Sequence, residues 1–194
     1  MEIERLHGRA IEAWLSQLAR LRIRVFREFP YLYDGSIDYE KRYLQTYLRC
    51  PDSVMVLVLD QGQLVGASSG LPMAAEEADF QRPFLEQGYD IDRIFYCGES
   101  VLLPDYRGRG LGVRFFDERE DHARALGRFD TICFCAVQRP ADHPRRPQGY
   151  VPLDDFWRRR GYKKHPELST RYLWQDLDES DESPKPMVFW LKKL

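Results

Sequence analysis

A glycine-rich turn with two arginines, Arg107-Gly108-Arg109-Gly110-Leu111-Gly112, is the segment of this 194-residue chain best suited to binding chemistry. An apolar run, residues 94–103, precedes it, and an amphipathic helix is predicted to begin at Leu111. The first N–H groups of a helix have no partner within it and point at a ligand alongside the positive end of the helix dipole. Glycines let a bulky anion approach the backbone, and arginines add charge-assisted donors. The segment therefore predicts a pyrophosphate site.

Two other phosphate-binding motifs do not fit this turn. A dinucleotide fingerprint requires Gly-x-Gly-x-x-Gly, which Gly108 and Gly110 begin but Val113 breaks. A Walker-type loop requires Gly-Lys-Ser/Thr before its helix, and no such lysine is present. The remaining alternative is a glycine-rich turn with two solvated arginines, and the strand–turn–helix context favours the anion site over it.

The elements that position this turn are predicted to form one mixed α/β domain, residues 1–194. Apolar patterns predict strands at residues 3–7, 54–59, 63–69, 94–103, 131–137, 168–175 and 187–191, the fourth broken at Gly98. Helical spacing predicts helices at residues 11–26, 36–48, 111–126 and 153–160. Because helices alternate with strands through the middle of the chain, we expect an α/β arrangement without a domain boundary.

Turn-forming residues mark several boundaries. Gly62 predicts a hairpin between two strands, Pro30 ends the first helix, and Gly127 stands where a helix C-cap glycine belongs. Residues 138–152 contain four prolines and three arginines and are expected to form an ordered loop or lid. Residues 176–182 are expected to form an acidic, solvated surface turn.

Composition narrows the classes of function. Lys and Arg total 29 against 31 acidic residues, a formal net charge of -2, so no nucleic-acid partner is expected. The N-terminus lacks the layout of a secretory signal, and no apolar run approaches the roughly 18 residues that span a bilayer. We therefore expect a cytoplasmic protein without a membrane partner. The cysteines and histidines lack zinc-ligand spacing, so we expect buried reduced thiols and no metal.

With these residues in place, the sequence resembles the GNAT acetyltransferase superfamily. The family signature, Arg/Gln-x-x-Gly-x-Gly/Ala between the fourth strand and the third helix, is matched by Arg107, Gly110 and Gly112. A second feature, an aromatic pair followed by x-x-x-Gly-aromatic, is matched by Phe156-Trp157-Arg158-Arg159-Arg160-Gly161-Tyr162. The order of elements agrees over nearly the whole chain.

The resemblance implies a central, mostly antiparallel twisted sheet flanked by helices, with two parallel strands splayed around acetyl-CoA. These would be residues 94–103 and 131–137. It also implies that the strand end Val101-Leu102-Leu103 pairs with the pantetheine amides and that residues 107–112 hold the pyrophosphate. An amine would attack the thioester directly, without an acyl-enzyme intermediate. The reaction needs a base, an oxyanion donor and an acid for the thiolate.

Glu99 is the predicted base, acting through water. By period two it shares a face with Cys97 and Val101, and a carboxylate among apolar neighbours has a raised pKa. The alternative is a glutamate paired with an arginine of the same site, and the sequence leaves both open. Many family members place a tyrosine acid where Trp157 stands, and an indole cannot protonate a thiolate. We predict that Tyr150 substitutes as the acid, or that the thiolate leaves unassisted or by way of water, and that Trp157 packs in the core.

On the acceptor side, Tyr31 and Tyr33 are predicted to face the groove that the family uses for acceptors. Arg139 is predicted to bind an acidic group on the acceptor or on coenzyme A, and its alternative is a solvated surface charge. Tyr39, Tyr43 and Tyr47 recur every four residues and are interpreted as a helix-packing stripe.

The leading functional hypothesis is transfer of an acetyl group to a primary amine of a small molecule. A second is acetylation of a protein or peptide, which needs an open groove, whereas residues 72–89 and 138–152 look able to close the site. A third is a coenzyme A-binding sensor with a catalytically dead site. Residues 187–191 are expected to form an apolar edge strand that pairs two subunits in a homodimer.

Overall fold

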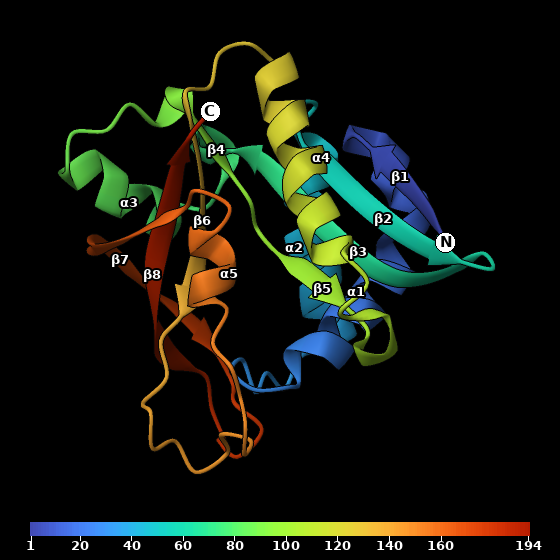
Figure 1. The fold of residues 1–194 in the computed structure, drawn as a ribbon, viewed down its shortest axis with the longest axis vertical. Helices are drawn as coiled ribbons and strands as arrows, with labels where there is room; N and C mark the ends of the chain where they lie inside the picture. Colours follow the sequence, from blue (N-terminus) through green and yellow to red (C-terminus); the bar gives the residue numbers. More distant parts are fainter.

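A twisted sheet of eight strands forms the centre of the protein (Figure 1). The computed structural model describes residues 1–194. Its strands are β1 (Glu2–Leu6), β2 (Val54–Asp60), β3 (Gln63–Pro72), β4 (Ile94–Tyr96), β5 (Ser100–Leu102), β6 (Thr131–Val137), β7 (Lys163–Trp174) and β8 (Ser183–Lys193). They run in the order β1-β2-β3-β4-β6-β8-β7, with β5 also paired to β3. Only β4 and β6 are parallel neighbours, which confirms the predicted mixed α/β fold.

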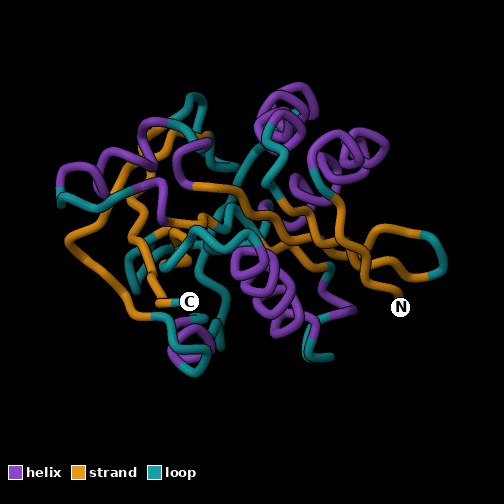
Figure 2. Tube along the Cα trace, turned by 90° about the horizontal axis from the view of Figure 1, so that it is seen from above, coloured by secondary structure: helices purple, strands orange, loops and turns teal.

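Helices cover both faces of the sheet, as Figure 2 shows. The first core cluster lies under α1 (Leu15–Phe26), α2 (Ile37–Arg49) and α3 (Ala78–Glu86). The second lies under α4 (Leu111–Ala125) and α5 (Asp154–Arg158). Short 3-10 segments complete the chain: Gly8–Trp14, Met73–Ala75, Ile91–Arg93 and Pro104–Tyr106. None of the helices has the length and apolar character needed to cross a bilayer.

Local signals in the sequence mark several element boundaries. Ser36 caps α2, because its hydroxyl accepts a bond from Tyr39 N at 3.3 Å. Gly62 in the β2–β3 turn and Gly127 after α4 have φ of 76° and 70°, left-handed conformations that favour glycine. The helix predicted from residue 11 instead begins at Leu15, because the preceding turns are 3-10.

The last strand, β8, is not the edge of the sheet. It pairs with β6 on one side and β7 on the other, and its Phe189 and Trp190 are fully buried. The prediction that residues 187–191 form an exposed edge for pairing subunits is therefore wrong. An apolar run predicts a strand, but long-range pairing decides its neighbours.

A β-bulge interrupts the strand predicted at residues 94–103. Leu71 faces Tyr96 and Ser68 faces Ser100, so three steps along β3 correspond to four on the opposite strand. Ser69 N donates to the carbonyl of residue 99 at 3.1 Å, and its carbonyl accepts from the N–H of residue 98 at 3.2 Å. A bulge of this kind bends its strand. Beyond it β5 pairs with β3 alone while β6 continues along β8, so the two parallel strands diverge.

Candidate active site

The divergence leaves backbone groups of β5 without a strand partner. The Glu99 carbonyl and the Leu103 N–H bond to β3. Because alternate residues of a strand bond to opposite sides, Ser100 and Leu102 direct their backbone groups toward β6, and Val101 directs its own toward β3. Of the three residues predicted to pair with pantetheine, only Leu102 is oriented to do so, and Ser100 joins it. The Leu102 carbonyl already accepts a bond from Arg107 Nε at 3.1 Å, so its N–H is the group left without a partner.

The predicted anion-binding turn leads from the end of β5 into α4 (Figure 1). Five consecutive backbone N–H groups, from Gly108 to Gly112, donate to no acceptor in the protein. Gly108 and Gly110 have φ of +75° and +82°, and a Cβ built on either meets no atom within 4 Å. Unpaired N–H groups that face open space at a helix N-terminus suit phosphate oxygens.

These N–H groups, from Gly108 to Gly112, form a cradle for an anion, and the side chains of the turn complete it. Arg109 has no carboxylate partner, and its guanidinium lies 5.3 Å from the ring centroid of Tyr106. Arg107 pairs through Nη1 with Glu28 at 2.8 Å on the surface and donates from Nε to the Leu102 carbonyl at 3.1 Å, which leaves Nη2 without a partner. Leu111 is buried and anchors the first turn of α4. The free N–H donors, the open space beside Gly108 and Gly110, and the unpaired guanidinium of Arg109 together fit the pyrophosphate of coenzyme A.

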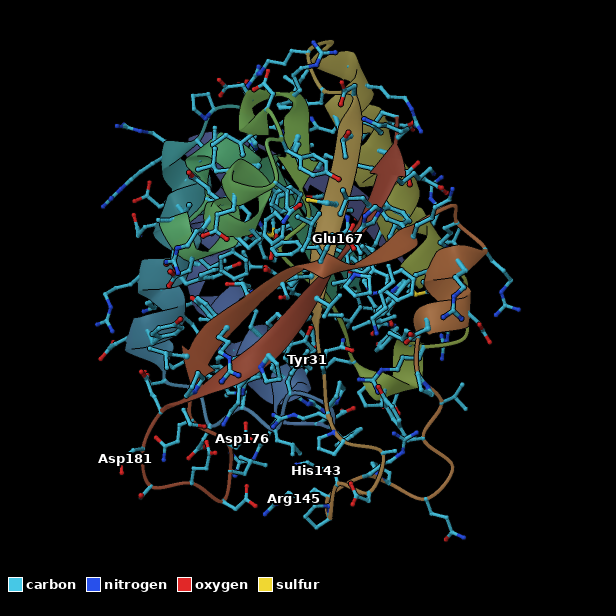
Figure 3. All side chains as sticks on the ribbon, turned by 90° about the vertical axis from the view of Figure 1, so that its left-hand side faces the viewer. Tyr31, His143, Arg145, Glu167, Asp176 and Asp181 are labelled. Atoms are coloured by element: carbon cyan, nitrogen blue, oxygen red, sulfur yellow. The ribbon has the colours of Figure 1, made fainter.

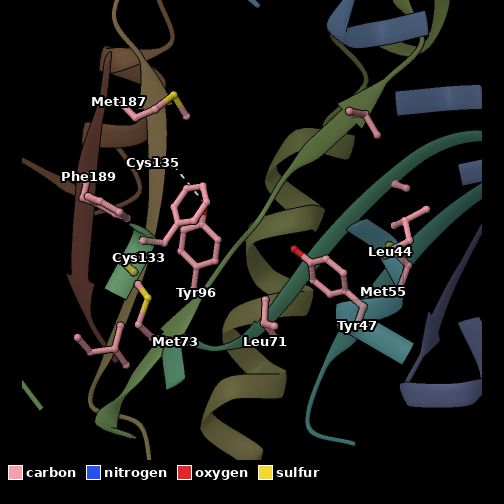
Figure 4. Close-up of a cluster of buried hydrophobic side chains, with 14 of the residues drawn as sticks. Leu44, Tyr47, Met55, Leu71, Met73, Tyr96, Cys133, Cys135, Met187 and Phe189 are labelled. Atoms are coloured by element: carbon pink, nitrogen blue, oxygen red, sulfur yellow. Dashed lines mark hydrogen bonds between the residues drawn. The ribbon is translucent and has the colours of Figure 1, made fainter. Parts of the chain in front are cut away.

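A pocket of ≈ 90 Å³ adjoins the bulge on the face covered by α1 and α2. Fifteen residues line it, and it reaches both diverging strands through Gly98 and Glu99 of the bulge and Cys135 of β6. Figure 4 shows Tyr96 hydrogen-bonded to Cys135 here, with Tyr47 directing its hydroxyl toward them. A wider hollow of ≈ 820 Å³ lies between residues 7–12 and 45–51, which belong to neither the divergence nor the turn.

Glu99, the predicted base, lines this pocket and is 7% exposed. Arg22 Nη1 lies 2.6 Å from Glu99 Oε2, and the Tyr43 hydroxyl donates to the same oxygen at 3.2 Å. Through Nε, Arg22 also pairs with Glu40. The structure therefore has the arginine-paired glutamate that the sequence left open. Tyr43 and Arg22 fix the carboxylate at the bulge, beside the opening between β5 and β6.

The bulge also changes which residues share a face. Period two placed Cys97 with Glu99 and Val101, but Cys97 packs in the cluster under α4, whereas Val101 packs under α1 and α2. The extra residue reverses the alternation, so that expectation is wrong. Gly98 is required at the bulge, because a Cβ there would lie 2.0 Å from the Tyr47 hydroxyl.

Arg139 forms a buried clamp instead of an open anion site. Its guanidinium pairs with both carboxylate oxygens of Asp176, at 2.7 and 2.8 Å, and donates to the carbonyls of Pro30 and Tyr31 at 2.7 Å each. Four of its five N–H donors are therefore occupied, and it is neither an acceptor ligand nor a solvated charge. Asp176 is only 5% exposed, so the expected solvated acidic turn begins with a buried ion pair.

The clamp joins the loop after α1 to the end of the β7–β8 hairpin. Figure 3 shows Tyr31 and Asp176 at the same end of the molecule. Main-chain bonds reinforce the junction, because Asp34 N donates to the Gln175 carbonyl at 2.9 Å and a second bond links residues 177 and 32 at 2.8 Å. Tyr31 and Tyr33 of this loop line the pocket. The two segments thus close one side of the pocket.

The two aromatic residues considered for the acid lie apart from Glu99. Tyr150 packs edge-on against Phe29, with ring centroids 4.7 Å apart, and does not line the pocket. Burial raises the pKa of Tyr150. Trp157 packs against Phe134 and Trp190 at centroid distances of 5.0 and 5.1 Å, which confirms its predicted role in the core.

Burial raises the pKa values of two further side chains, Glu76 and Cys135. Burial raises the pKa of Glu76 to about 8. Burial also raises the pKa of Cys135 to about 12, so its side chain is a thiol and not a nucleophilic thiolate. All four cysteines are unpaired, as expected, and Cys50 is only half buried.

Several pocket residues were not predicted to be functional. Tyr39, interpreted as packing, places its hydroxyl 2.7 Å from that of Tyr172 on β7. Arg22 and Glu40 also line the pocket. The signal available was a charge in an apolar stripe: Arg22 follows Leu18 by four residues on the buried face of α1. Nothing in the sequence links these residues to β7, which lies over 100 positions away.

A sequence model of the acetyltransferase (GNAT) family matches residues 18–147, which include the bulge, the divergent strands and the cradle. The chain belongs to this family. As a GNAT acetyltransferase it is an acyltransferase of a family that uses acetyl-CoA. No curated protein sequence matches the chain significantly.

Solved GNAT structures share the fold at low sequence identity. A ribosomal-protein-alanine N-acetyltransferase from Brucella melitensis has a TM-score of 0.64 at 14% identity, with 100% of both chains covered. An aminoglycoside 6'-N-acetyltransferase complexed with coenzyme A has a TM-score of 0.60 at 17% identity, covering 100% of this chain and 97% of that one. Such likeness establishes the fold and leaves the acceptor open.

Proposed function

We propose that the protein transfers an acetyl group from acetyl-CoA to a primary amine of a small molecule, by direct attack of the amine. Membership of the GNAT family supports the acyl transfer, and the clamp between Arg139 and Asp176 supports the choice of a small acceptor. Arg139 and Asp176 tie together the two segments that would have to part to admit a peptide. The pocket beside them is small, at ≈ 90 Å³, which suits a compact group.

In the proposed reaction the residues of the cradle hold the pyrophosphate, and Ser100 and Leu102 bond the pantetheine arm. Bound acetyl-CoA supplies the thioester. A bond forms between the amine nitrogen and the acetyl carbon, and the bond from that carbon to sulfur breaks. Glu99, held by Arg22 and Tyr43, accepts a proton from the amine through water. The protonated state of Cys135 supports direct attack over an acyl-cysteine route.

The proton for the departing thiolate is predicted to come from Tyr150, which does not line the pocket, or from water. Tyr150→Phe is expected to lower kcat by about tenfold, less than most general-acid losses, because a thiolate leaves readily. Trp157→Phe, which changes the residue at the family's usual acid position, is expected to leave kcat within about twofold. Equal kcat for Tyr150→Phe and the unmodified protein in a thiol-release assay would remove Tyr150 from the mechanism.

Isothermal titration with acetyl-CoA, followed by thiol release over a panel of amines, tests the function as a whole. Binding together with release on small amines is the expected result. Release on peptide N-termini alone would replace the small-molecule acceptor with a peptide. Binding without release on any amine would favour a coenzyme A sensor, an alternative supported by the pairing of Glu99 with Arg22. Absence of binding would overturn the cradle assignment.

A further inference from the structure

The acceptor pocket is walled mainly by aromatic rings. Nine of its fifteen lining residues are aromatic, and Cys135 and Met187 add further apolar surface. The rings come from distant parts of the chain, with Tyr33 and Tyr39 opposite Tyr172 and Trp174 of β7. Phe80 of α3 packs against Tyr172 at a centroid distance of 5.0 Å. Such a wall favours an apolar or aromatic body on the molecule that enters.

The charges around the pocket leave no cation for an acidic group. Arg22 is the one cation in the lining, and it pairs with both Glu40 and Glu99 while its guanidinium lies 4.2 Å from the ring centroid of Tyr43. Arg139 nearby is committed to Asp176. One arginine against two carboxylates gives the lining a net charge of one negative, which attracts an ammonium and repels a carboxylate.

The polar groups that remain are too few for a polycationic or polyhydroxylated acceptor. The Tyr39 and Tyr172 hydroxyls bond to each other at 2.7 Å, and the Tyr43 hydroxyl bonds to Glu99. Both carboxylates are buried, with side-chain exposures of 0% for Glu40 and 3% for Glu99. A molecule with several ammonium groups would bury most of them without partners, which is unfavourable.

From these observations we propose that the acceptor is a monoamine with a compact aromatic or aliphatic body and no acidic group. The inference rests on the proposed function and narrows its substrate class. The rings contact the body, and the aromatic faces and the negative lining favour the ammonium before it loses its proton at Glu99. Free amino acids and aminoglycosides fall outside the class, the first for their carboxylate and the second for their charges and size.

Two matched acceptors test the class directly. Phenethylamine and phenylalanine share a ring and an amine and differ by one carboxylate. We expect kcat/KM for phenethylamine to exceed that for phenylalanine, and that for kanamycin, by at least about tenfold. Equal or better turnover of phenylalanine or kanamycin would overturn the inference and leave the acetyltransferase function standing. Acetyl-CoA binding with no turnover of phenethylamine would also overturn it, whereas failure to bind acetyl-CoA would overturn the proposed function itself.

Variants of β7 test whether the aromatic wall recognises the acceptor. Tyr172→Ala is expected to raise the KM for phenethylamine about tenfold while the Kd of acetyl-CoA stays unchanged. Tyr172→Phe keeps the ring and is expected to restore most of the affinity. Leu173→Ala is the control, because Leu173 is the next residue along the strand, faces the opposite side and is 53% exposed. An unchanged KM in a folded Tyr172→Ala protein would contradict the proposal.

Discussion

Along the chain, only β5 and a short 3-10 turn lie between the bulge at the acceptor pocket and the cradle, but the two sites are built differently. The cradle uses the backbone N–H groups of five consecutive residues, Gly108 to Gly112, and a Cβ added at Gly108 or Gly110 would face open space. The pocket uses side chains from α1, α2, α3, four strands and the loop after α1, and its charges are buried against one another. The cradle is therefore formed by neighbouring residues, whereas the pocket exists only when the whole domain is assembled.

This difference predicts that substitutions in the two sites affect different properties, namely ligand binding and stability. A change in the cradle removes an interaction with the ligand and leaves the rest of the protein unaltered. A change in the charged pair beneath the pocket leaves a buried charge without its partner, so the fold itself loses stability. Four experiments test this difference.

The largest effect is expected for Arg22→Met. It leaves the buried carboxylates of Glu40 and Glu99 without their cation, which should lower the free energy of unfolding by about 3–5 kcal/mol. Arg27→Met is the matched control on the same segment, because the pair of Arg27 with Asp34 is exposed and worth about 0–1 kcal/mol. Urea unfolding measures both. Similar losses of unfolding free energy in the two variants would mean that the buried pair contributes no more to stability than the exposed pair.

Next in size is Gly110→Asp. A carboxylate about 4 Å from a phosphate charge costs about 4 kcal/mol at an effective dielectric constant of 20, so the Kd of acetyl-CoA should rise about a thousandfold. Gly127→Asp is the control, because Gly127 has a similar positive φ at the other end of α4, also with no atom within 4 Å of an added Cβ. Titration calorimetry should give wild-type affinity for the control. Wild-type affinity of the Gly110→Asp variant for acetyl-CoA would exclude this turn as the pyrophosphate site.

A smaller effect is expected for Glu99→Gln, which keeps the shape of the side chain and removes the proton acceptor. The value of kcat should fall about 100-fold, and the Kd of acetyl-CoA should stay within about twofold. Steady-state kinetics and calorimetry on the same preparation separate the two sites. Full activity of the variant would exclude Glu99 as the base.

The smallest effect, counted per pH unit, concerns the ionisation of Glu76. Its pKa is raised by burial from 4.5 to about 8, so the folded protein holds a proton that the unfolded chain releases above pH 4.5. Stability should therefore fall as pH rises from about 5 to about 8, by up to about 1.4 kcal/mol per pH unit. Glu76→Gln should flatten this slope in unfolding experiments. An unchanged slope would place its cause elsewhere.

The amino-acid sequence alone specified the cradle. Its glycines, its position between a strand and a helix, and the free N–H groups of that helix are properties of neighbouring residues, and the structure has them as predicted. The strands and helices were also predictable, because their apolar periods are local. The clamp was not, since Arg139 and Asp176 are 37 positions apart and each reads as a surface charge.

Only the tertiary structure decided the acceptor pocket and the place of β8 in the sheet. At the bulge, the absence of a side chain on Gly98 leaves room for the Tyr47 hydroxyl, and Glu99 lies on the face where Arg22 lies. Which strand neighbours which, and which buried charge meets which, depends on contacts between residues far apart in the chain. Backbone conformation near a glycine is decided within a few residues, whereas the partner of a buried charge is decided by the packing of the whole domain.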